Sequence, residues 1–428
     1  MKRSDLLSKL KNGQLNDRLE AVYGKNGLSA ALQRLTFLVE EFGRTFPCSD
    51  DTQTLLFSAP GRTELGGNHT DHQRGHCLAA SVDLDTIACV VPNGSNIVRI
   101  KSQHHHIAQI DLNDLQVHPE EAGSSVSLLR GVAARLHQMG YTVGGFDAYT
   151  TTRVLRGSGL SSSAAFEVLI GTIMNHLYCG GELTSTQIAQ IGQYAENVYF
   201  DKPCGLMDQL ACATGGVIAI DFHDADTPSL QQVHVDLTSE GYALCIIDSM
   251  ASHADLTADY AAIPQEMRAV AASLGKTVLS DVDEALFREN LSSVRAACGD
   301  RAALRAHHFF KDDKRVIAQC DALKNGDFDT FLRLVQTSGR SSFMYLQNVA
   351  TYRDSREQPV ALLLALAEDL LDGRGACRVH GGGFAGTMQA FVPLDILDAF
   401  IAGMEQVAGK GACHVLSIRD QGSILLIS

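Results

Sequence analysis

Three glycine-rich segments carry side chains that could bind a polar or phosphorylated ligand. The first is PGRTELGGNHTDHQRG, residues 60–75, where Arg62, Asn68, His69 and Asp71 surround a pair of glycines. Such a density of polar groups directly after a predicted strand suits a small polar ligand, because loops at strand ends often carry function. The alternative is a hydrophilic loop whose Asp and Asn residues only cap the backbone.

The second segment is RGSGLSSSAA, residues 156–165, between a predicted strand and an apolar helix. Its glycines let backbone N–H groups approach a ligand, and the helix N-terminus adds unpaired donors and the positive end of the helix dipole. This arrangement suits a phosphate group. Ser161, Ser162 and Ser163 add hydroxyl groups, one of which could bind a metal ion. A plain helix N-cap is the alternative.

The third segment is HGGGFAG, residues 380–386, also between a predicted strand and an apolar stretch. It could be a tight turn where two backbones cross, or the HGGG oxyanion element of an esterase. An esterase would also need a G-x-S-x-G elbow placed after the HGGG. The sequence has no such elbow, and its serine candidates precede the HGGG, so a hydrolase is excluded.

A carboxylate in an apolar setting is the fourth candidate. Asp208 lies in DKPCGLMDQL, residues 201–210, and Glu196 precedes this segment. Such a carboxylate is either a helix cap or an acid with a perturbed pKa. The chain has neither a G-x-x-x-x-G-K-[ST] loop nor a G-x-G-x-x-G fingerprint. The adjacent histidines 104–106 cannot share one face of a strand and are expected to be solvated.

The elements that must position these groups mix helices and strands without a regular βαβ rhythm, which favours an α+β fold. Hydrophobic periodicity predicts helices at 1–45, 126–139, 161–178, after Gly181, over most of 260–338, at 359–371 and at 394–407. Strands are predicted at 54–59, within 78–100, and at 146–152, 217–220, 244–248, 376–380 and 387–392, with two more at the end. Pro60-Gly61 predicts a turn. A domain boundary is expected at Gly215-Gly216.

Composition excludes several classes of protein. The 428 residues include 35 Lys and Arg against 49 Asp and Glu, a net charge of −14, which argues against a nucleic-acid binder. No apolar run approaches the roughly 20 residues of a membrane helix. The first 20 residues lack the apolar core of a signal peptide. Eleven scattered cysteines without a C-x-x-C pair indicate reduced thiols and a cytoplasmic protein.

Taken together, the segments resemble the GHMP small-molecule kinases and, within them, the galactokinases. PGRTELGGNHTDH resembles the galactokinase signature, roughly GRVNLIGEHTDY, and RGSGLSSSAAFEV resembles the phosphate loop P-x-x-x-G-L-x-S-S-A. CRVHGGGFAG resembles the third motif, usually GGGFGGC, and PCGLMDQ resembles PCGIMDQ, which supplies the catalytic aspartate. The motifs occur in the order and with the spacing of the family, and the similarity runs from about residue 30 to the end.

The resemblance implies a two-domain α+β fold with sugar and ATP meeting in the interdomain cleft. Residues 1–30 would form a helical extension, 31–215 the N-terminal kinase domain and 216–428 the C-terminal domain. The implied reaction transfers a phosphoryl group from ATP to the anomeric hydroxyl of galactose. The expected partners are these two small molecules, without nucleic acid or membrane, and the chain is expected to be a monomer or weak homo-oligomer.

Residue roles follow from the matched motifs. Asp208 would be the catalytic base, and Arg62 would keep it ionised and steady the transferring phosphoryl group. The implied sugar contacts are Arg62, Asn68, His69, Asp71, Gly205, Asp208 and Tyr260. The implied ATP-binding residues are Gly157, Ser158, Gly159, Leu160, Ser161, Ser162 and Ser163. Ser163 and Glu196 would hold Mg²⁺, and Gly382 and Gly383 of the third motif would lie against the substrates.

Because the sequence departs from the family pattern at several positions, the resemblance does not determine which sugar is the substrate. Asn68 stands where galactokinases carry a Glu that accepts a hydrogen bond from the 6-hydroxyl of the sugar. A neutral amide would tolerate a carboxylate at C6, so galacturonate or another galactose modified at C6 or C2 is the alternative substrate. Leu155 replaces the proline of the loop. A non-catalytic sugar and ATP sensor is a further alternative, although such sensors lose the Ser-Ala pair that Ser163-Ala164 keeps.

Overall fold

The computed structural model describes residues 1–155, 159–224, 226–251, 256–351, 356–384 and 386–428. An eight-stranded sheet is ordered β12-β1-β2-β5-β3-β4, and β6 pairs with β2 and β7. Its strands are β1 (Leu55–Gly66), β2 (His76–Pro92), β3 (Ile97–Ser102), β4 (Ile107–Asp111), β5 (Phe146–Thr152), β6 (Val217–Asp221), β7 (Ser229–Val233) and β12 (Ile424–Ile427). A second, four-stranded sheet is ordered β11-β8-β10-β9 and consists of β8 (Tyr242–Asp248), β9 (Ala376–Val379), β10 (Thr387–Pro393) and β11 (Cys413–Leu416).

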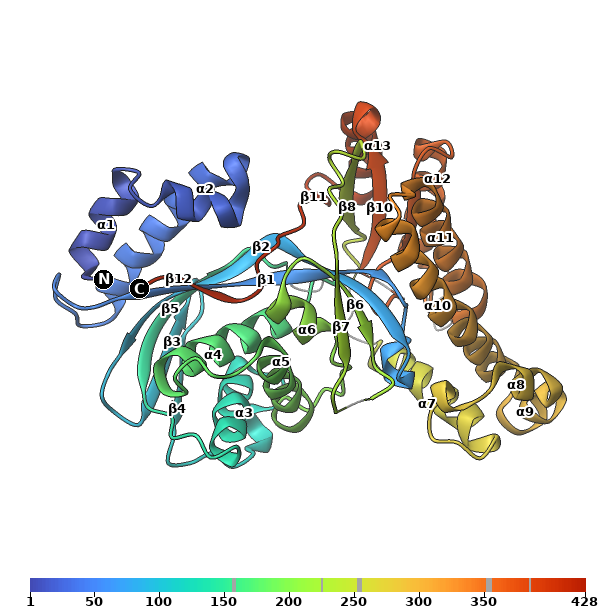
Figure 1. Cartoon of the computed structure of the whole chain (residues 1–428), viewed down its shortest axis with the longest axis horizontal. Helices are drawn as coiled ribbons and strands as arrows, with labels where there is room; N and C mark the ends of the chain where they lie inside the picture. Colours follow the sequence, from blue (N-terminus) through green and yellow to red (C-terminus); the bar gives the residue numbers. More distant parts are fainter. Residues whose placement is uncertain (156–158, 225, 252–255, 352–355, 385) are drawn as a thin grey trace.

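Helices cover both sheets (Figure 1). The helices along the first half are α1 (Arg3–Lys11), α2 (Asn16–Thr45), α3 (Ser125–Gln138), α4 (Ser162–Tyr178), α5 (Ser185–Tyr194) and α6 (Met207–Thr214). Those of the second half are α7 (Thr257–Ser273), α8 (Glu284–Glu289), α9 (Leu291–Cys298), α10 (Asp300–Lys324), α11 (Phe328–Ser341), α12 (Pro359–Leu371) and α13 (Leu397–Ala408). Two π-helical turns, Ala195–Tyr199 and Ser342–Leu346, follow α5 and α11.

Alternation along the strands explains how each sheet is buried on two faces. Ile87 and Cys89 of β2 pack in the cluster formed with α1 and α2, while Ala88 and Val90 belong to the main core with α4. Successive side chains of a strand point to opposite faces, so one apolar run serves both layers. In Figure 1, α1 and α2 accordingly lie on one side of the large sheet and α4 on the other.

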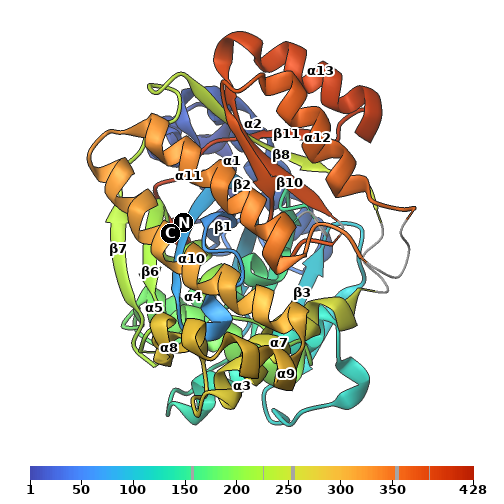
Figure 2. The ribbon, with the colours of Figure 1, turned by 90° about the vertical axis from the view of Figure 1, so that its right-hand side faces the viewer.

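The small sheet is buried in the same way. Cys245 and Ile247 of β8 pack with α12 and α13, whereas Leu244 and Ile246 join the main core together with residues of α11. Figure 2 shows α10 and α11 running side by side across the molecule. α11 contacts β9 of the small sheet and β1 of the large sheet, and α10 contacts β1 and β2, so the two helices tie the small sheet to the large one.

Most predicted elements are confirmed, but the turn at Pro60-Gly61 is wrong. The strand continues through both residues as β1, with a shift in its pairing to β2 between Pro60 and Arg62. Proline lacks an N–H donor and is tolerated in a strand at such irregularities. The pairing with β12 involves Leu56–Ser58 and lies before Pro60. The continued strand carries Arg62 directly into the site described below.

The sheets do not divide at Gly215-Gly216. β6 and β7, which follow these glycines, pair onto β2, and the last strand, β12, returns to β1. The large sheet therefore contains strands from both sides of residue 215, and the change of sheet lies between β7 and β8. The domain boundary itself stays a prediction.

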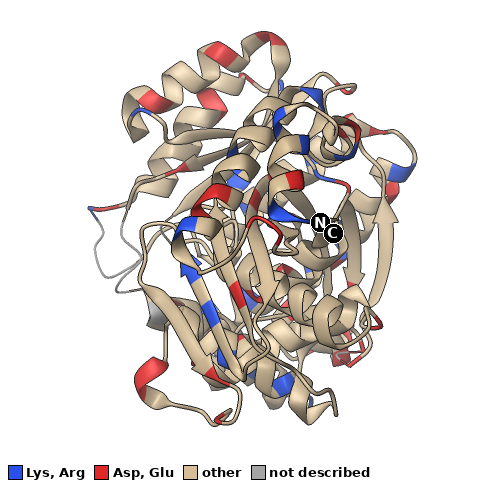
Figure 3. Cartoon of the chain, turned by 90° about the vertical axis from the view of Figure 1, so that its left-hand side faces the viewer, with Lys and Arg blue, Asp and Glu red and all other residues tan. Residues whose placement is uncertain are grey.

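The helices and the surface of the molecule can also be compared with the predictions from composition. No helix within the described residues is long and apolar enough to cross a membrane. On the side of the molecule drawn in Figure 3, acidic and basic residues are scattered over most of the elements. The histidines at 104–106 are exposed in the turn after β3, as expected for solvated side chains.

Candidate active site

The predicted phosphate loop precedes α4, and the residue before this helix, Ser161, does not cap it. Gly157 and Ser158 lie outside the described residues, so the loop is followed from Gly159. Ser161 adopts a left-handed conformation (φ 55°), and its hydroxyl donates to Asp208 instead of capping the helix. The first N–H groups of α4, beginning at Ser162, have no acceptor within the helix. This helix N-terminus is a suitable site for a phosphate group.

Gly159 packs against the third motif. Its φ is +68°, and a Cβ at this position would lie 2.8 Å from His380 Nδ1 and 2.9 Å from Thr387 Oγ1. His380 is buried and its pKa is lowered well below the usual value by burial and by Arg62, so the ring is neutral. Segments more than 200 residues apart in the sequence therefore meet at Gly159.

Replacing Gly159 with Val is expected to lower the affinity for Mg·ATP. A side chain at this φ costs about 1–3 kcal/mol, and the Cβ must also displace His380 or Thr387. Calorimetric titration with Mg·ATP measures the loss. Gly94→Val is the matched control, because Gly94 has the same φ of +68° but open space around its Cβ. An unchanged Kd in Gly159→Val would show that the nucleotide binds elsewhere.

Arg62 and Asp208 form the ionic centre of the site. Asp208, in the first turn of α6, accepts a 2.6 Å hydrogen bond from Arg62 Nε on one oxygen and a hydrogen bond from Ser161 on the other. Arg62 also donates to the carbonyl of Gly159. Burial raises the pKa of Asp208, but the charge of Arg62 and the hydrogen bonds from Arg62 and Ser161 together outweigh burial and leave the pKa below its usual value. The carboxyl is therefore ionised at neutral pH.

Asp71 is held beside the start of α6. Its carboxylate lies directly over Gly205, where any Cβ would overlap Asp71 Oδ2. Gly205 precedes Asp208 by three residues, so the first motif and the segment bearing Asp208 meet here. Only glycine allows this close approach.

Three of the predicted sugar-binding residues donate to carbonyl groups of the third motif. Asn68 Nδ2 donates to Gly381 O (2.8 Å), His69 Nε2 to Gly382 O (3.1 Å) and the Tyr260 hydroxyl to Gly383 O (2.8 Å). Burial lowers the pKa of His69 to about 3, so its neutral ring can donate from Nε2. The ring of Tyr260 also lies against Gly382, where a Cβ would collide with it. These contacts bring the predicted residues His69, Tyr260, Gly382 and Gly383 together.

The structure brings Ser163 and Glu196, the two predicted Mg²⁺ ligands, into contact. The Ser163 hydroxyl donates to Glu196 Oε1 over 2.9 Å, and the π-helical turn carries the buried Glu196. Gln209 Nε2 bridges Glu196 Oε2 (2.9 Å) and Glu167 Oε2 (3.0 Å). The other oxygen of Glu167 is buried without a hydrogen-bond partner among the described residues. A hydroxyl and carboxylate oxygens fit a hard cation such as Mg²⁺.

Several residues of the site did not emerge from the sequence. Lys202 Nζ lies 3.1 Å from Glu196 Oε1, and Glu64 forms a buried ion pair with Arg378. Glu167 did leave a signal, since it is the one charged residue in the apolar stretch AAFEVLIG. Asn348, which donates to Gly382 O over 3.2 Å, left none.

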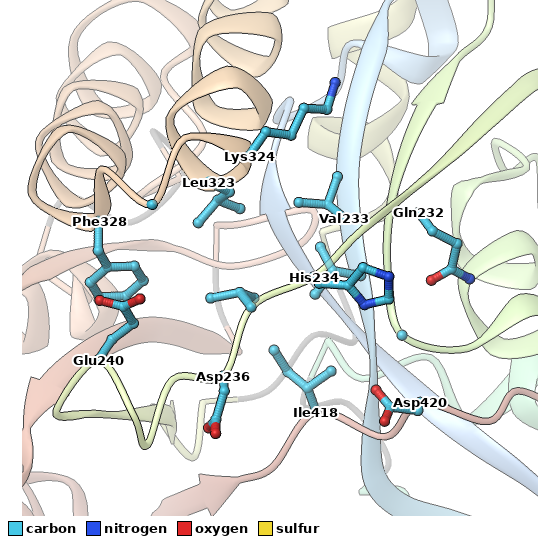
Figure 4. A pocket seen from close by; sticks show the side chains of 14 residues that line it. Gln232, Val233, His234, Asp236, Glu240, Leu323, Lys324, Phe328, Ile418 and Asp420 are labelled. Atoms are coloured by element: carbon cyan, nitrogen blue, oxygen red, sulfur yellow. The ribbon is translucent and has the colours of Figure 1, made fainter.

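A separate cavity of about 460 Å³ lies between β7, the turn from α10 to α11 and the segment before β12 (Figure 4). Its lining combines the apolar Val233, Leu323 and Phe328 with charged groups such as Lys324 and Asp420. None of the residues predicted for the site lines it. The residues predicted for catalysis and binding therefore lie around Asp208 and not in this cavity.

Comparison with known proteins agrees with this geometry. Residues 40–92 match the galactokinase galactose-binding signature, and residues 127–216 match the N-terminal domain of the GHMP kinases. A curated galactokinase of Streptomyces coelicolor is 30% identical over 355 residues, which is 82% of this chain and 87% of that protein. The two matched regions contain Arg62, Asn68, Ser163 and Asp208.

Solved structures share the fold. The galactokinase of Lactococcus lactis, crystallised with galactose, superposes with a TM-score of 0.78 at 24% identity and covers 92% of this chain and 100% of its own. The mevalonate kinase of Methanococcus jannaschii gives a TM-score of 0.60 at 13% identity over 86% of this chain and 98% of its own. With 30% identity to a curated galactokinase over most of both chains, the protein belongs to the galactokinase family of the GHMP kinases.

Proposed function

We propose that this chain transfers the γ-phosphoryl group of ATP to the anomeric hydroxyl of galactose. The observation that carries the proposal is the buried Arg62–Asp208–Ser161 contact, which joins the galactose-binding signature, the catalytic aspartate and the phosphate loop. Phosphoryl transfer requires mainly positioning and charge stabilisation. One ionised acid, one arginine and a helix N-terminus supply these requirements.

In this proposal Asp208 accepts the proton of the anomeric hydroxyl as the phosphoryl group is transferred. Arg62 keeps Asp208 ionised and neutralises negative charge near the transferring group. His69, Asp71, Gly205 and Tyr260 bind the sugar, because they surround Asp208 and the third motif. Gly382 and Gly383 have no side chains, so the third motif lies close to both substrates.

The phosphate groups of ATP bind at the segment from Gly159 to Ser163, together with Gly157 and Ser158. Ser163 and Glu196 hold Mg²⁺, and Lys202 adds a positive charge beside them. When bound, Mg²⁺ neutralises charge on the β- and γ-phosphate oxygens. No group of three His, Cys, Asp or Glu side chains in the described part of the chain could hold a metal ion alone.

Glu196→Gln is expected to raise the Mg²⁺ concentration needed for half-maximal activity by at least about 10-fold, because a ligand carboxylate becomes a neutral amide. Titration of free Mg²⁺ at saturating ATP and sugar measures the change. Glu182→Gln, an exposed substitution on the loop before α5, is the control and should leave the curve unchanged. Equal Mg²⁺ requirements in both variants would remove Glu196 from the metal site.

A coupled ADP-release assay over galactose, galacturonate, galactosamine and N-acetylgalactosamine tests the function. Galactose is expected to give the highest kcat/KM. Faster turnover of galacturonate would make the uronate the substrate, and binding without any turnover would identify a sensor. We also propose that the protein acts in the cytoplasm, since all eleven cysteines are free thiols. We propose in addition that it is a monomer or weak oligomer.

A further inference from the structure

Asn68 has no hydrogen-bonding capacity left for a sugar. Its side chain is fully buried, and Nδ2 donates to Gly381 O (2.8 Å) and to Glu64 Oε1 (3.1 Å). Its Oδ1 accepts from Asn348 Nδ2 (2.8 Å) and from the Ser342 hydroxyl (3.2 Å). An amide side chain offers two donor and two acceptor positions. Protein groups fill all four.

The backbone of Asn68 is fixed as well. Its N–H donates to Asp312 Oδ2 over 2.9 Å, and its carbonyl accepts from His308 Nε2 over 3.0 Å. Both partners are buried residues of α10. Turning Asn68 toward a ligand would leave several buried polar groups without partners, which is costly. The residue is therefore locked in this orientation.

A second acidic side chain beside Asn68, in addition to Asp312, lies four residues earlier in the chain. Glu64 is buried, forms an ion pair with the fully buried Arg378 and accepts from Asn68. Aligned with GRVNLIGEHTDY, this chain has Glu at the position of the family Asn and Asn at the position of the family Glu. One acid and one amide are thus kept, in exchanged positions and in direct contact.

We propose that Glu64 and Asn68 are an exchanged acid–amide pair, in which Asn68 positions the third motif and does not read C6 of the sugar. The proposal rests on the sugar kinase function proposed above. Asn68 binds Gly381, and the third motif carries His380, which lies against Gly159 of the phosphate loop. Loss of the Asn68 amide should therefore weaken ATP binding and not selectivity at C6.

A double-mutant cycle tests the pairing without any activity measurement. Asn68→Glu places a second carboxylate beside Glu64, and Glu64→Asn leaves Arg378 without its partner, so each single variant should lose about 5 °C or more in Tm. The double variant E64N/N68E restores one acid and one amide and should recover part of that loss, but not all of it, because a carboxylate at residue 68 cannot donate to Gly381 O. Additive losses in the double variant would overturn the pairing. This result is independent of which sugar the protein phosphorylates.

Sugar selectivity tests the second part of the proposal. In Asn68→Ser, the ratio of kcat/KM for galactose to that for 6-deoxygalactose should stay within about twofold of the wild-type ratio, while KM for ATP rises. Asn175→Ser is the control, because it removes another buried amide, bonded to Leu183, and should leave KM for ATP unchanged. A ratio that falls toward one in Asn68→Ser would show that residue 68 reads the 6-hydroxyl and would overturn the proposal.

Discussion

Replacement of Asp208 by Asn is expected to abolish turnover while the affinity for the sugar stays close to that of the wild type. Removal of a general base typically costs about 10²–10⁴-fold in rate. The amide keeps the size of the carboxylate and can still accept the hydrogen bond from Arg62 Nε. Measurement of kcat, together with calorimetric titration of the sugar, separates the two effects. A kcat near the wild-type value would remove Asp208 from the mechanism.

Ser161→Ala is the matched control for this experiment. It removes the other hydrogen bond to Asp208 but leaves the carboxylate in place, so its effect on kcat should be much smaller. The pH profile gives a further check. Because the pKa of Asp208 is lowered from 3.8, the base stays ionised as the pH falls to 5. Any acidic limb above that pH must come from another group.

The motifs could be predicted from the sequence because each is a contiguous run. Arg62, His69 and Asp71 lie within ten residues, so their proximity follows from the local chain alone. The partners that fix them could not be predicted. Asn68 is bound by groups 274 to 313 residues further along the chain. Spacing in the sequence carries no information about such contacts, which form only when the chain after α11 and the third motif pack against the first motif.

Helices and strands could be predicted where apolar residues recur at a regular spacing. They could not be predicted where contacts with other parts of the chain determine the local structure. β7 has the sequence SLQQV, which is mostly exposed, and it forms by pairing with β6. The apolar spacing after Gly181 places Ile188, Ile191 and Val198 on one face of a continuous helix. Instead, Val198 is 42% exposed, because the chain widens into the π-helical turn at Ala195–Tyr199. The wider turn rotates the following residues and places Glu196 in the site.

Residues 1–30 were expected to form an extension, and their packing gives them a structural role. Leu6, Leu10 and Leu19 are buried in one cluster with Leu56 of β1 and Ile427 of β12. The same helical layer continues to Thr45 at the end of α2. These residues therefore cover one face of the large sheet, which would otherwise expose apolar side chains to water.

Asp85 of β2 connects this helical layer to the sheet and to the end of the chain. Its fully buried carboxylate accepts hydrogen bonds from the Tyr23 hydroxyl (2.7 Å), Arg34 Nη1 (2.7 Å) and the Ser58 hydroxyl (2.6 Å). Arg419 Nη1 lies 3.4 Å away and is itself buried. Burial raises the pKa of Asp85, but the charges of Arg34 and Arg419 and the hydrogen bonds from Ser58 and Arg34 together more than offset burial and hold the pKa below 3.8.

Asp85→Asn is expected to lower the free energy of unfolding by about 3–5 kcal/mol, because it leaves two arginines without their buried counter-charge. Chemical denaturation at pH 7 measures the loss, and Tyr23→Phe, which removes one hydrogen bond, should cost only about 1 kcal/mol. A group with a lowered pKa stabilises the fold above its unfolded pKa, so the difference between wild type and Asp85→Asn should shrink as the pH falls below 3.8. Equal stability of the two proteins at pH 7 would show that the network does not hold the helical layer to the sheet.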